Sequence, residues 1–279
     1  MTDVASQFLP NTRIEIINPN IVKGQCRTVL FDFDGTLSLV REGWPEVMIP
    51  MMVEILAETP TKETREELFP KVEEFVMKLN GKQTIYQMIQ LAEEVAKRGG
   101  TPREALDYKN QYHDLLWERV HGRVEGLQNG TIDPEILTVP GSRELLELLK
   151  GKGKPCYLAS GTDEKYVKNE LAALQLDAFF GPHVYGAQDD YKNFSKKMVI
   201  DRLIKDNKLD NGGLLGFGDG YVEIEEVKGV GGIAVGVASD EKHRVGINDW
   251  KRNRLIQAGA DVIIPDYREV TTLLEYLGV

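Results

Sequence analysis

Acidic and hydroxyl side chains recur in this sequence at the points where short apolar runs end. Asp32 and Asp34 follow the first run, Ser160 follows a second, and Asp219, with Glu223 shortly after it, follows a third. The runs are Thr28–Phe31, Cys156–Ala159 and Leu214–Phe217, and each contains residues that favour β-strands. Because ligands of open parallel sheets bind beyond the carboxyl ends of the strands, these side chains are candidates for one shared site.

The carboxylates predict a divalent cation. Residues i and i+2 of a strand point to the same side, so Asp32 and Asp34 should converge unless the turn redirects Asp34. Close carboxylates repel each other, and therefore one must be neutral or a cation must lie between them. Asp219 adds a third negative group, and oxygen ligands without His or Cys suit Mg²⁺. Each acid taken alone also fits a solvated loop, whereas the set of strand ends favours a site.

The elements that must position these residues form an alternating pattern. Strands are expected at residues 28–31, 156–159, 183–185, 214–217, 233–237 and 262–264, with a short edge strand near 13–17. Helices are expected at residues 142–151, 163–174, 195–207, 221–228, 251–258 and 267–277. Strands that alternate with helices predict an α/β fold with a parallel sheet covered on both faces.

A different pattern interrupts this alternation. Between Trp44 and Val120 the apolar residues take helical spacing, which predicts amphipathic helices near residues 44–58, 63–79, 84–97 and 103–120. Gly81, Gly99–Gly100 and Gly122 separate them. We therefore expect a core domain made of residues 1–40 and 140–279, and an all-helical domain of residues 41–139 inserted after the first strand.

The composition excludes several classes of protein. Of the 279 residues, 42% are hydrophobic and 28% charged, as in soluble globular proteins. The net charge of −10 argues against a nucleic-acid binder. No apolar run approaches the ~18 residues that span a membrane, and the first residues do not resemble a signal peptide. Cys26 and Cys156 lie outside any zinc motif and fit a reducing cytosol, so we expect a cytoplasmic protein; its oligomeric state is left open.

Three of these segments resemble motifs of the haloacid dehalogenase superfamily. Phe31–Leu37, with the letters FDFDGTL, resembles the first motif, and Ser160 after its apolar run resembles the second. Gly218–Glu223 is similar to the fourth. The helical insert resembles the cap of the phosphatase branch that includes phosphoglycolate phosphatase-like and β-phosphoglucomutase-like proteins. The resemblance implies a Rossmann-like three-layer core.

The resemblance also implies roles. Asp32 would be the nucleophile that forms an aspartyl-phosphate, and Asp34 would protonate the leaving oxygen and then activate water. Ser160 and the backbone N–H of Gly161 would hold phosphate oxygens. Asp219 would bind Mg²⁺ together with Asp32 and the Asp34 carbonyl oxygen. The implied reaction is hydrolysis of a phosphate monoester.

Two positions leave alternatives. The family's third motif is a lysine, for which Lys196 and Lys197 both qualify in the first turn of a helix capped by Ser195. The spacing of the apolar residues that follow favours Lys196. The fourth motif usually ends in Asp, and Glu223 stands there instead; it either reaches the metal, directly or through a water, or is an ordinary helix residue.

The implied cap supplies candidates for substrate recognition. Residues just after the first motif and one loop between cap helices often contact the substrate in this family. Here these segments are Arg41–Trp44 and Asn80–Thr84. Arg41 or Lys82 could hold a second anionic or hydroxyl-bearing group, although each also fits a surface charge. We expect a small phosphorylated metabolite as substrate, such as a sugar phosphate or phosphoglycolate.

The presence of Asp34 argues against some of the other functions known in this superfamily. Haloacid dehalogenases lack this second Asp, and phosphonoacetaldehyde hydrolases replace it with Ala, although Lys82 would suit their cap lysine. A phosphomutase shares both Asp32 and Asp34 and stays open, as does a non-catalytic binding module. A dinucleotide-binding loop is disfavoured because Tyr221 stands where the third glycine of GxGxxG belongs.

Overall fold

Eight strands form one sheet in the residues that the computed structural model describes, which are 7–188, 190–210 and 212–279. Their order across the sheet is β1-β2-β8-β7-β6-β3-β4-β5. The strands are β1 (Gln7–Phe8), β2 (Glu15–Ile16), β3 (Thr28–Phe31), β4 (Cys156–Asp163), β5 (Val184–Ala187), β6 (Leu214–Gly218), β7 (Ile233–Val237) and β8 (Val262–Ile264). Strands β3 to β8 run parallel, whereas β1 and β2 add an antiparallel edge beside β8. The predicted parallel sheet and the strand near residues 13–17 are therefore confirmed.

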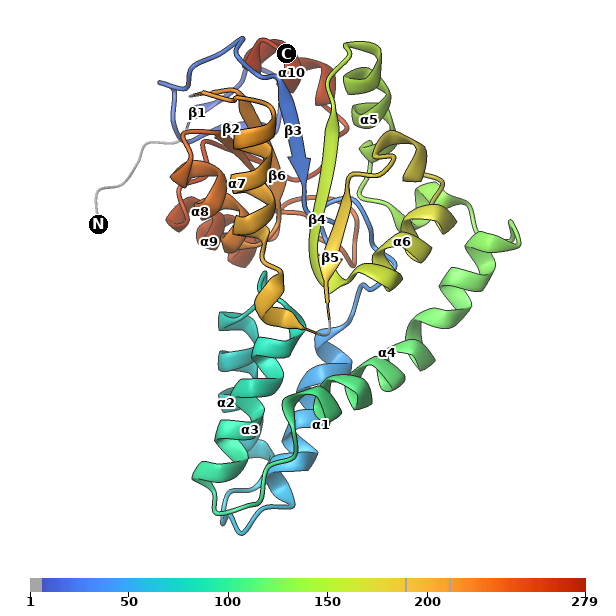
Figure 1. Cartoon of the computed structure of the whole chain (residues 1–279), viewed down its shortest axis with the longest axis vertical. Helices are drawn as coiled ribbons and strands as arrows, with labels where there is room; N and C mark the ends of the chain where they lie inside the picture. The colour runs from blue at the N-terminus through green and yellow to red at the C-terminus, as the bar shows by residue number, and fades with distance from the viewer. Residues whose placement is uncertain (1–6, 189, 211) are drawn as a thin grey trace.

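Helices cover both faces of this sheet. The helices outside the insert are α5 (Ser142–Gly151), α6 (Glu164–Ala173), α7 (Lys196–Asp206), α8 (Tyr221–Gly229), α9 (Asp249–Gln257) and α10 (Val270–Leu277), with 3₁₀ turns η1 (Pro134–Leu137), η2 (Asp177–Phe179) and η3 (Tyr191–Asn193). Figure 1 shows α7, α8 and α9 on one side of the sheet and α5 and α6 on the other.

The alternation of side chains along β3 explains these layers. Leu30 belongs to a cluster with buried residues of α7, α8 and α9. Val29 and Phe31 point to the opposite face and join a second cluster with residues of α5, α6 and α10. All three side chains are at most 2% exposed, so β3 is the buried centre of the three-layer fold.

The insert follows β3 and is helical, as predicted. It consists of α1 (Pro45–Ala57), α2 (Arg65–Lys78), α3 (Thr84–Lys97) and α4 (Ala105–Gln128). Figure 1 shows these helices beyond the end of the sheet toward which β3 points. Thr64 and Glu67 form a reciprocal capping box at the start of α2. The domain boundaries at residues 41 and 139 stay a prediction.

The largest departures from the predicted bounds are the ends of α4 and β4. Helix α4 ends at Gln128 and not near Val120, because buried apolar residues continue at helical spacing through Val124 and Leu127. The exposed Gly122 lies inside this pattern, and a glycine within a helix costs only about 1 kcal/mol. Strand β4 continues to Asp163, through residues predicted to form a turn. Its pairing with β5 shifts register between Ala159 and Asp163, which marks an irregularity beside the site.

None of the helices in the described part of the chain is both long and apolar enough to cross a membrane.

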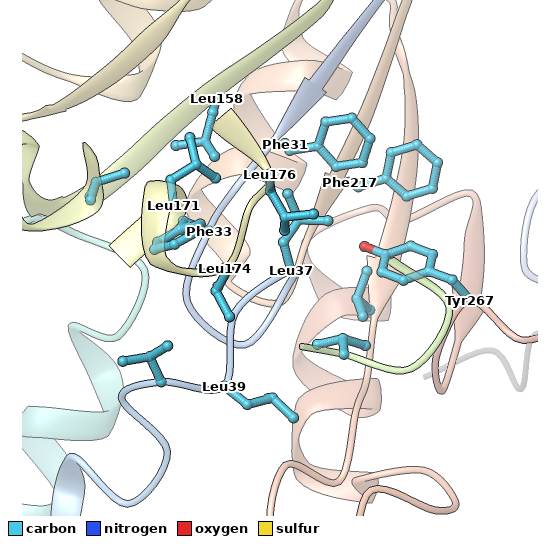
Figure 2. Packing of buried hydrophobic residues seen from close by; sticks show 14 of the residues in the cluster. Phe31, Phe33, Leu37, Leu39, Leu158, Leu171, Leu174, Leu176, Phe217 and Tyr267 are labelled. Carbon is cyan, nitrogen blue, oxygen red and sulfur yellow. The ribbon is translucent and has the colours of Figure 1, made fainter. Parts of the chain in front are cut away.

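Aromatic side chains of β3 and β6 pack together in the buried core, and Figure 2 shows Phe31, Phe217 and Tyr267 among them. The ring of Phe31 stacks on that of Phe217 with centroids 5.0 Å apart and planes 7° apart, and meets Phe180 edge-on at 5.9 Å. Tyr267 approaches Phe217 at 5.8 Å. Because Asp32 follows Phe31 directly, this packing fixes where β3 delivers its carboxylate.

We predict that Phe31→Ala lowers the free energy of unfolding by about 3–5 kcal/mol, the usual cost of removing a fully buried aromatic ring. Chemical denaturation followed by circular dichroism measures it. Phe69→Ala is the matched control, since Phe69 of α2 is 43% exposed, and its effect should stay within about 0.5 kcal/mol. A loss below about 1 kcal/mol for Phe31→Ala would contradict the assigned role of the stack.

Candidate active site

One cavity lies between the carboxyl edge of the sheet and the helical insert. Neighbouring strands β6, β3 and β4 end at this edge and bring the residues that the sequence analysis singled out to one place. Those that line the cavity are Asp32, Asp34, Arg41, Lys82, Ser160, Gly161, Lys196 and Asp219. Glu223 lies beside them and is 3% exposed.

Asp32 and Glu223 share one buried lysine. The Nζ atom of Lys196 lies 2.9 Å from Asp32 Oδ2 and 2.8 Å from Glu223 Oε2. Burial disfavours its charged form, but the charges of Asp32 and then Glu223 outweigh burial and raise the pKa of Lys196. Burial raises the pKa of Asp32 well above its usual value, against the opposing charge of Lys196. The lysine therefore stays charged between two carboxylates.

The two candidate lysines have different surroundings. Lys196 is buried, whereas Lys197 is exposed and lies 3.2 Å from Asp201 one turn further along α7. The helix begins as expected, with the Ser195 hydroxyl accepting a hydrogen bond from the backbone N–H of Met198 at 3.1 Å. Of the pair, Lys196 is the one that the fold brings to the cavity.

Asp34 contacts the opposite wall of the cavity. Its Oδ2 accepts hydrogen bonds from Thr162 Oγ1 at 2.8 Å and from Ser160 Oγ at 3.4 Å. Its Oδ1 lies 3.9 Å from Arg41 Nε and accepts no hydrogen bond from the described residues. Burial raises the pKa of Asp34 to about 6, although Arg41 opposes the shift. Thr162 was not assigned a role from the sequence; its signal is a hydroxyl two residues beyond Ser160 on the same strand.

Glu223 is not an ordinary solvated helix residue. Its Oε1 accepts a hydrogen bond from the backbone N–H of Gly220, the N-cap of α8, at 2.6 Å, and its Oε2 binds Lys196. Burial raises its pKa, but the charge of Lys196 and the hydrogen bonds from Lys196 and the backbone N–H of Gly220 together lower it overall. Single carboxylate oxygens of Asp32, Asp219 and Glu223 lie within 4.8 Å of one another. This oxygen-only donor set fits a hard divalent cation such as Mg²⁺.

A second buried lysine supports Asp219. Lys251 of α9 places its Nζ 2.8 Å from Asp219 Oδ2 and 2.6 Å from Glu241 Oε1. Neither Lys251 nor Glu241 was identified from the sequence; for Glu241 the signal is an acid shortly after the end of β7. Gly35 has φ 71°, and a Cβ there would lie 2.3 Å from Asp219 Oδ2, so only glycine fits this turn.

The loop between α2 and α3 lies against the site. A Cβ at Gly161 would lie 2.7 Å from the Lys82 carbonyl oxygen, and one at Gly220 would lie 3.0 Å from Gly81 Cα. Gln83 donates from Nε2 to the Phe194 carbonyl oxygen at 2.7 Å. The backbone of this loop therefore touches both the β4 and the β6 side of the cavity.

Arg254 of α9 holds the end of α2 that leads into this loop. Its guanidinium donates to the carbonyl oxygens of Met77, Lys78 and Asn80, the last two at 2.7 and 3.3 Å. The carbonyl groups at a helix end lack partners within the helix, and a cation there is favourable. The arginine also stacks 4.5 Å from the centre of the Tyr221 ring. This contact was not predicted from the sequence.

The two predicted recognition cations differ. Arg41 is buried and forms a bidentate ion pair with Glu170 of α6, with Nε–Oε2 and Nη2–Oε1 distances of 3.1 and 2.7 Å. Lys82 is exposed, and its Nζ lies 5.9 Å from the centre of the Tyr86 ring. Arg41 is therefore not a surface charge, and Glu170 is a further residue that the sequence analysis missed.

The chain is similar to known proteins both in its sequence family and in its fold. A family model described as haloacid dehalogenase-like hydrolase matches residues 26–231. A structure of a predicted phosphoglycolate phosphatase from Haemophilus somnus is 17% identical and covers 89% of this chain and 98% of its own, with a TM-score of 0.59. A β-phosphoglucomutase from Clostridium difficile is 14% identical over 90% of this chain and 97% of its own, also at 0.59.

A hydrolase of this kind from Deinococcus radiodurans with bound phosphate and sodium is 16% identical over 92% of this chain and 98% of its own, at a TM-score of 0.55. No curated protein matches the chain significantly. The structures establish the shared fold, and the family model covers well over half of the sequence. The chain therefore belongs to the haloacid dehalogenase-like hydrolases.

Proposed function

We propose that the protein is a Mg²⁺-dependent phosphatase that hydrolyses a small phosphorylated metabolite through an aspartyl-phosphate on Asp32. The observation that carries the proposal is the buried Asp32–Lys196–Glu223 chain, at 2.9 and 2.8 Å, beside Asp219. The resemblance of a related phosphate-bound structure from Deinococcus radiodurans supports a phosphate ligand in this fold.

In the first step, a carboxylate oxygen of Asp32 attacks phosphorus and the bond from phosphorus to the leaving oxygen breaks. Asp34 gives its proton to that oxygen, which leaves as an alcohol. A carboxyl group whose pKa is about 6 is suited to this exchange near neutral pH. Lys196, Ser160 and the backbone N–H of Gly161 balance and hold the phosphoryl oxygens.

In the second step, water attacks the aspartyl-phosphate, Asp34 takes its proton, and phosphate leaves while the Asp32 carboxylate is restored. Mg²⁺ held by Asp32, the Asp34 carbonyl oxygen and Asp219, with Glu223 direct or through water, would offset the negative charge that develops in both steps.

The helical insert, residues 41–139, would be the cap of this enzyme, and residues 1–40 and 140–279 its catalytic core. The Asn80–Gln83 backbone lies against the site, which supports a role in excluding water during the reaction. Arg41 and Lys82 would face the leaving group. We place the enzyme in the cytoplasm, with a small-molecule substrate and no nucleic-acid partner.

We predict that Asp32→Asn abolishes release of phosphate from p-nitrophenyl phosphate with Mg²⁺, because the nucleophile is lost, and that Asp34→Asn slows it about 10²–10⁴-fold. Both should keep the circular dichroism of the wild type. The control is Asp206→Asn on the exposed side of α7, which should match the wild type. Full activity of either site variant would refute the mechanism, whereas phosphoryl transfer to a sugar phosphate in place of water would identify a phosphomutase.

The neighbouring lysines give a matched pair. Lys196→Met should lower kcat about 10²-fold or more, as expected when a charge that stabilises the transition state is removed. Lys197→Met should leave kcat within about twofold, because this side chain is exposed and pairs only at the surface. If the two variants lower kcat equally in steady-state assays, the assignment of Lys196 as the site lysine is wrong.

Removal of divalent cations tests the metal. Dialysis against EDTA should silence hydrolysis, and Mg²⁺ should restore it, since the cluster of Asp32, Asp219 and Glu223 concentrates negative charge. Calorimetric titration of the EDTA-treated protein should detect Mg²⁺ binding that Asp219→Asn weakens. Sustained turnover in EDTA would disprove the metal assignment.

A further inference from the structure

Arg41 presents to the cavity a guanidinium whose charge is already compensated. It precedes α1, lines the cavity and is 9% exposed. Behind it, Glu170 of α6 is 2% exposed and accepts hydrogen bonds from Arg41 Nε at 3.0 and 3.1 Å and from Nη2 at 2.7 Å. The hydrogen bonds to Glu170 use Nε and Nη2 of Arg41, which leaves Nη1 for a substrate oxygen.

Arg41 and the carboxylates beside it carry no net positive charge. The attraction between opposite charges is strongest where water is excluded, and Glu170 and Arg41 are both buried. Asp34 adds a second carboxylate, with Oδ1 at 3.9 Å from Arg41 Nε. An anionic group placed beside Arg41 would therefore feel the carboxylate behind the guanidinium as well as the guanidinium itself.

The other cations that line the cavity do not add a positive charge that could hold a second anionic group. Lys196 lies between Asp32 and Glu223. Lys82 is exposed, where solvent and salt screen its charge. The rest of the lining includes the uncharged side chains of Trp44, Asn80, Thr84 and Tyr112 and the acids Glu42 and Glu241. Hydrogen-bonding oxygens fit this lining better than a second negative group.

We propose that Glu170 sets the substrate class of this enzyme by acting through Arg41. As a positioning residue, it orients the guanidinium and cancels its charge, so the cavity selects phosphate monoesters with a neutral, oxygen-bearing leaving group. Esters whose leaving group carries a carboxylate or second phosphate are disfavoured. The inference rests on the proposed phosphatase function, because it concerns the leaving group of that reaction.

Two esters of nearly equal size separate these classes. 2-Hydroxyethyl phosphate has a neutral leaving group, and phosphoglycolate has a carboxylate in the same place. We expect the wild type with Mg²⁺ to favour 2-hydroxyethyl phosphate in kcat/KM. Glu170→Gln should shift the ratio about tenfold toward phosphoglycolate, since it uncovers the charge of Arg41. If Glu170→Gln also alters the proton transfer by Asp34, it does so for both esters, and this effect cancels in the ratio of their kcat/KM values.

Opposite variants and a matched control sharpen the test. Arg41→Gln leaves Glu170 uncompensated and should shift the ratio further toward 2-hydroxyethyl phosphate; it also serves if Glu170→Gln does not fold. Glu164→Gln alters an acid of the same helix that pairs with Lys168, and it should leave the ratio unchanged. A wild type that prefers phosphoglycolate, or ratios that stay within about twofold in both site variants, would overturn the proposal.

Binding separates this inference from the function on which it rests. Calorimetry on Asp32→Asn and Asp32→Asn/Glu170→Gln with Mg²⁺ measures Kd for both esters without turnover. A shift of the Kd ratio toward phosphoglycolate supports the role of Glu170 even where the wild type hydrolyses neither ester, an outcome that would count against the phosphatase. An unchanged Kd ratio counts against Glu170 alone.

Discussion

The site depends on compensation of buried negative charge, since carboxylates taken out of water are costly unless cations pair with them. Each of three buried cations lies between two carboxylates. Lys196 lies between Asp32 and Glu223, Lys251 between Asp219 and Glu241, and Arg41 between Asp34 and Glu170. Six acids thus share three cations. The deficit is concentrated where Asp32, Asp219 and Glu223 meet, which is where a divalent cation fits.

The insert can lie this close to the core only because two core positions lack side chains. Gly161 and Gly220 face the backbone of the Asn80–Gln83 loop, and a Cβ at Gly161 would overlap the Lys82 carbonyl group. Arg254 adds hydrogen bonds from α9 to the carbonyl groups that end α2. Steric fit at the loop and helix capping behind it therefore act on the same segment, and together they set the depth of the cavity below it.

Local patterns explain what could be predicted from the sequence. The parallel strands and Asp32, Asp34, Asp219 and Lys196 follow from apolar runs, motif spacing and helix periodicity, which operate over a few residues. The partners of these residues do not. Arg41 and Glu170 are 129 residues apart, and nothing near Glu170 marks it as different from other helix acids. Lys251 and Arg254 likewise acquire their meaning only when α9 packs beside the site. At Gly122 a local pattern gave a wrong prediction, because this exposed glycine was expected to separate helices and instead lies inside α4.

The glutamate at position 223 has a physical explanation in the same terms. One carboxylate oxygen accepts the N–H of Gly220 at the start of α8, and the other binds Lys196. An aspartate would have one methylene less with which to span from the helix N-terminus to the lysine. The longer side chain thus links the α8 N-terminus, Lys196 and Asp32 into one hydrogen-bonded unit, with the carboxylate placed where the helix dipole favours it. The position of α8 therefore affects Asp32 through Glu223 and Lys196, although α8 and Asp32 are far apart in the sequence.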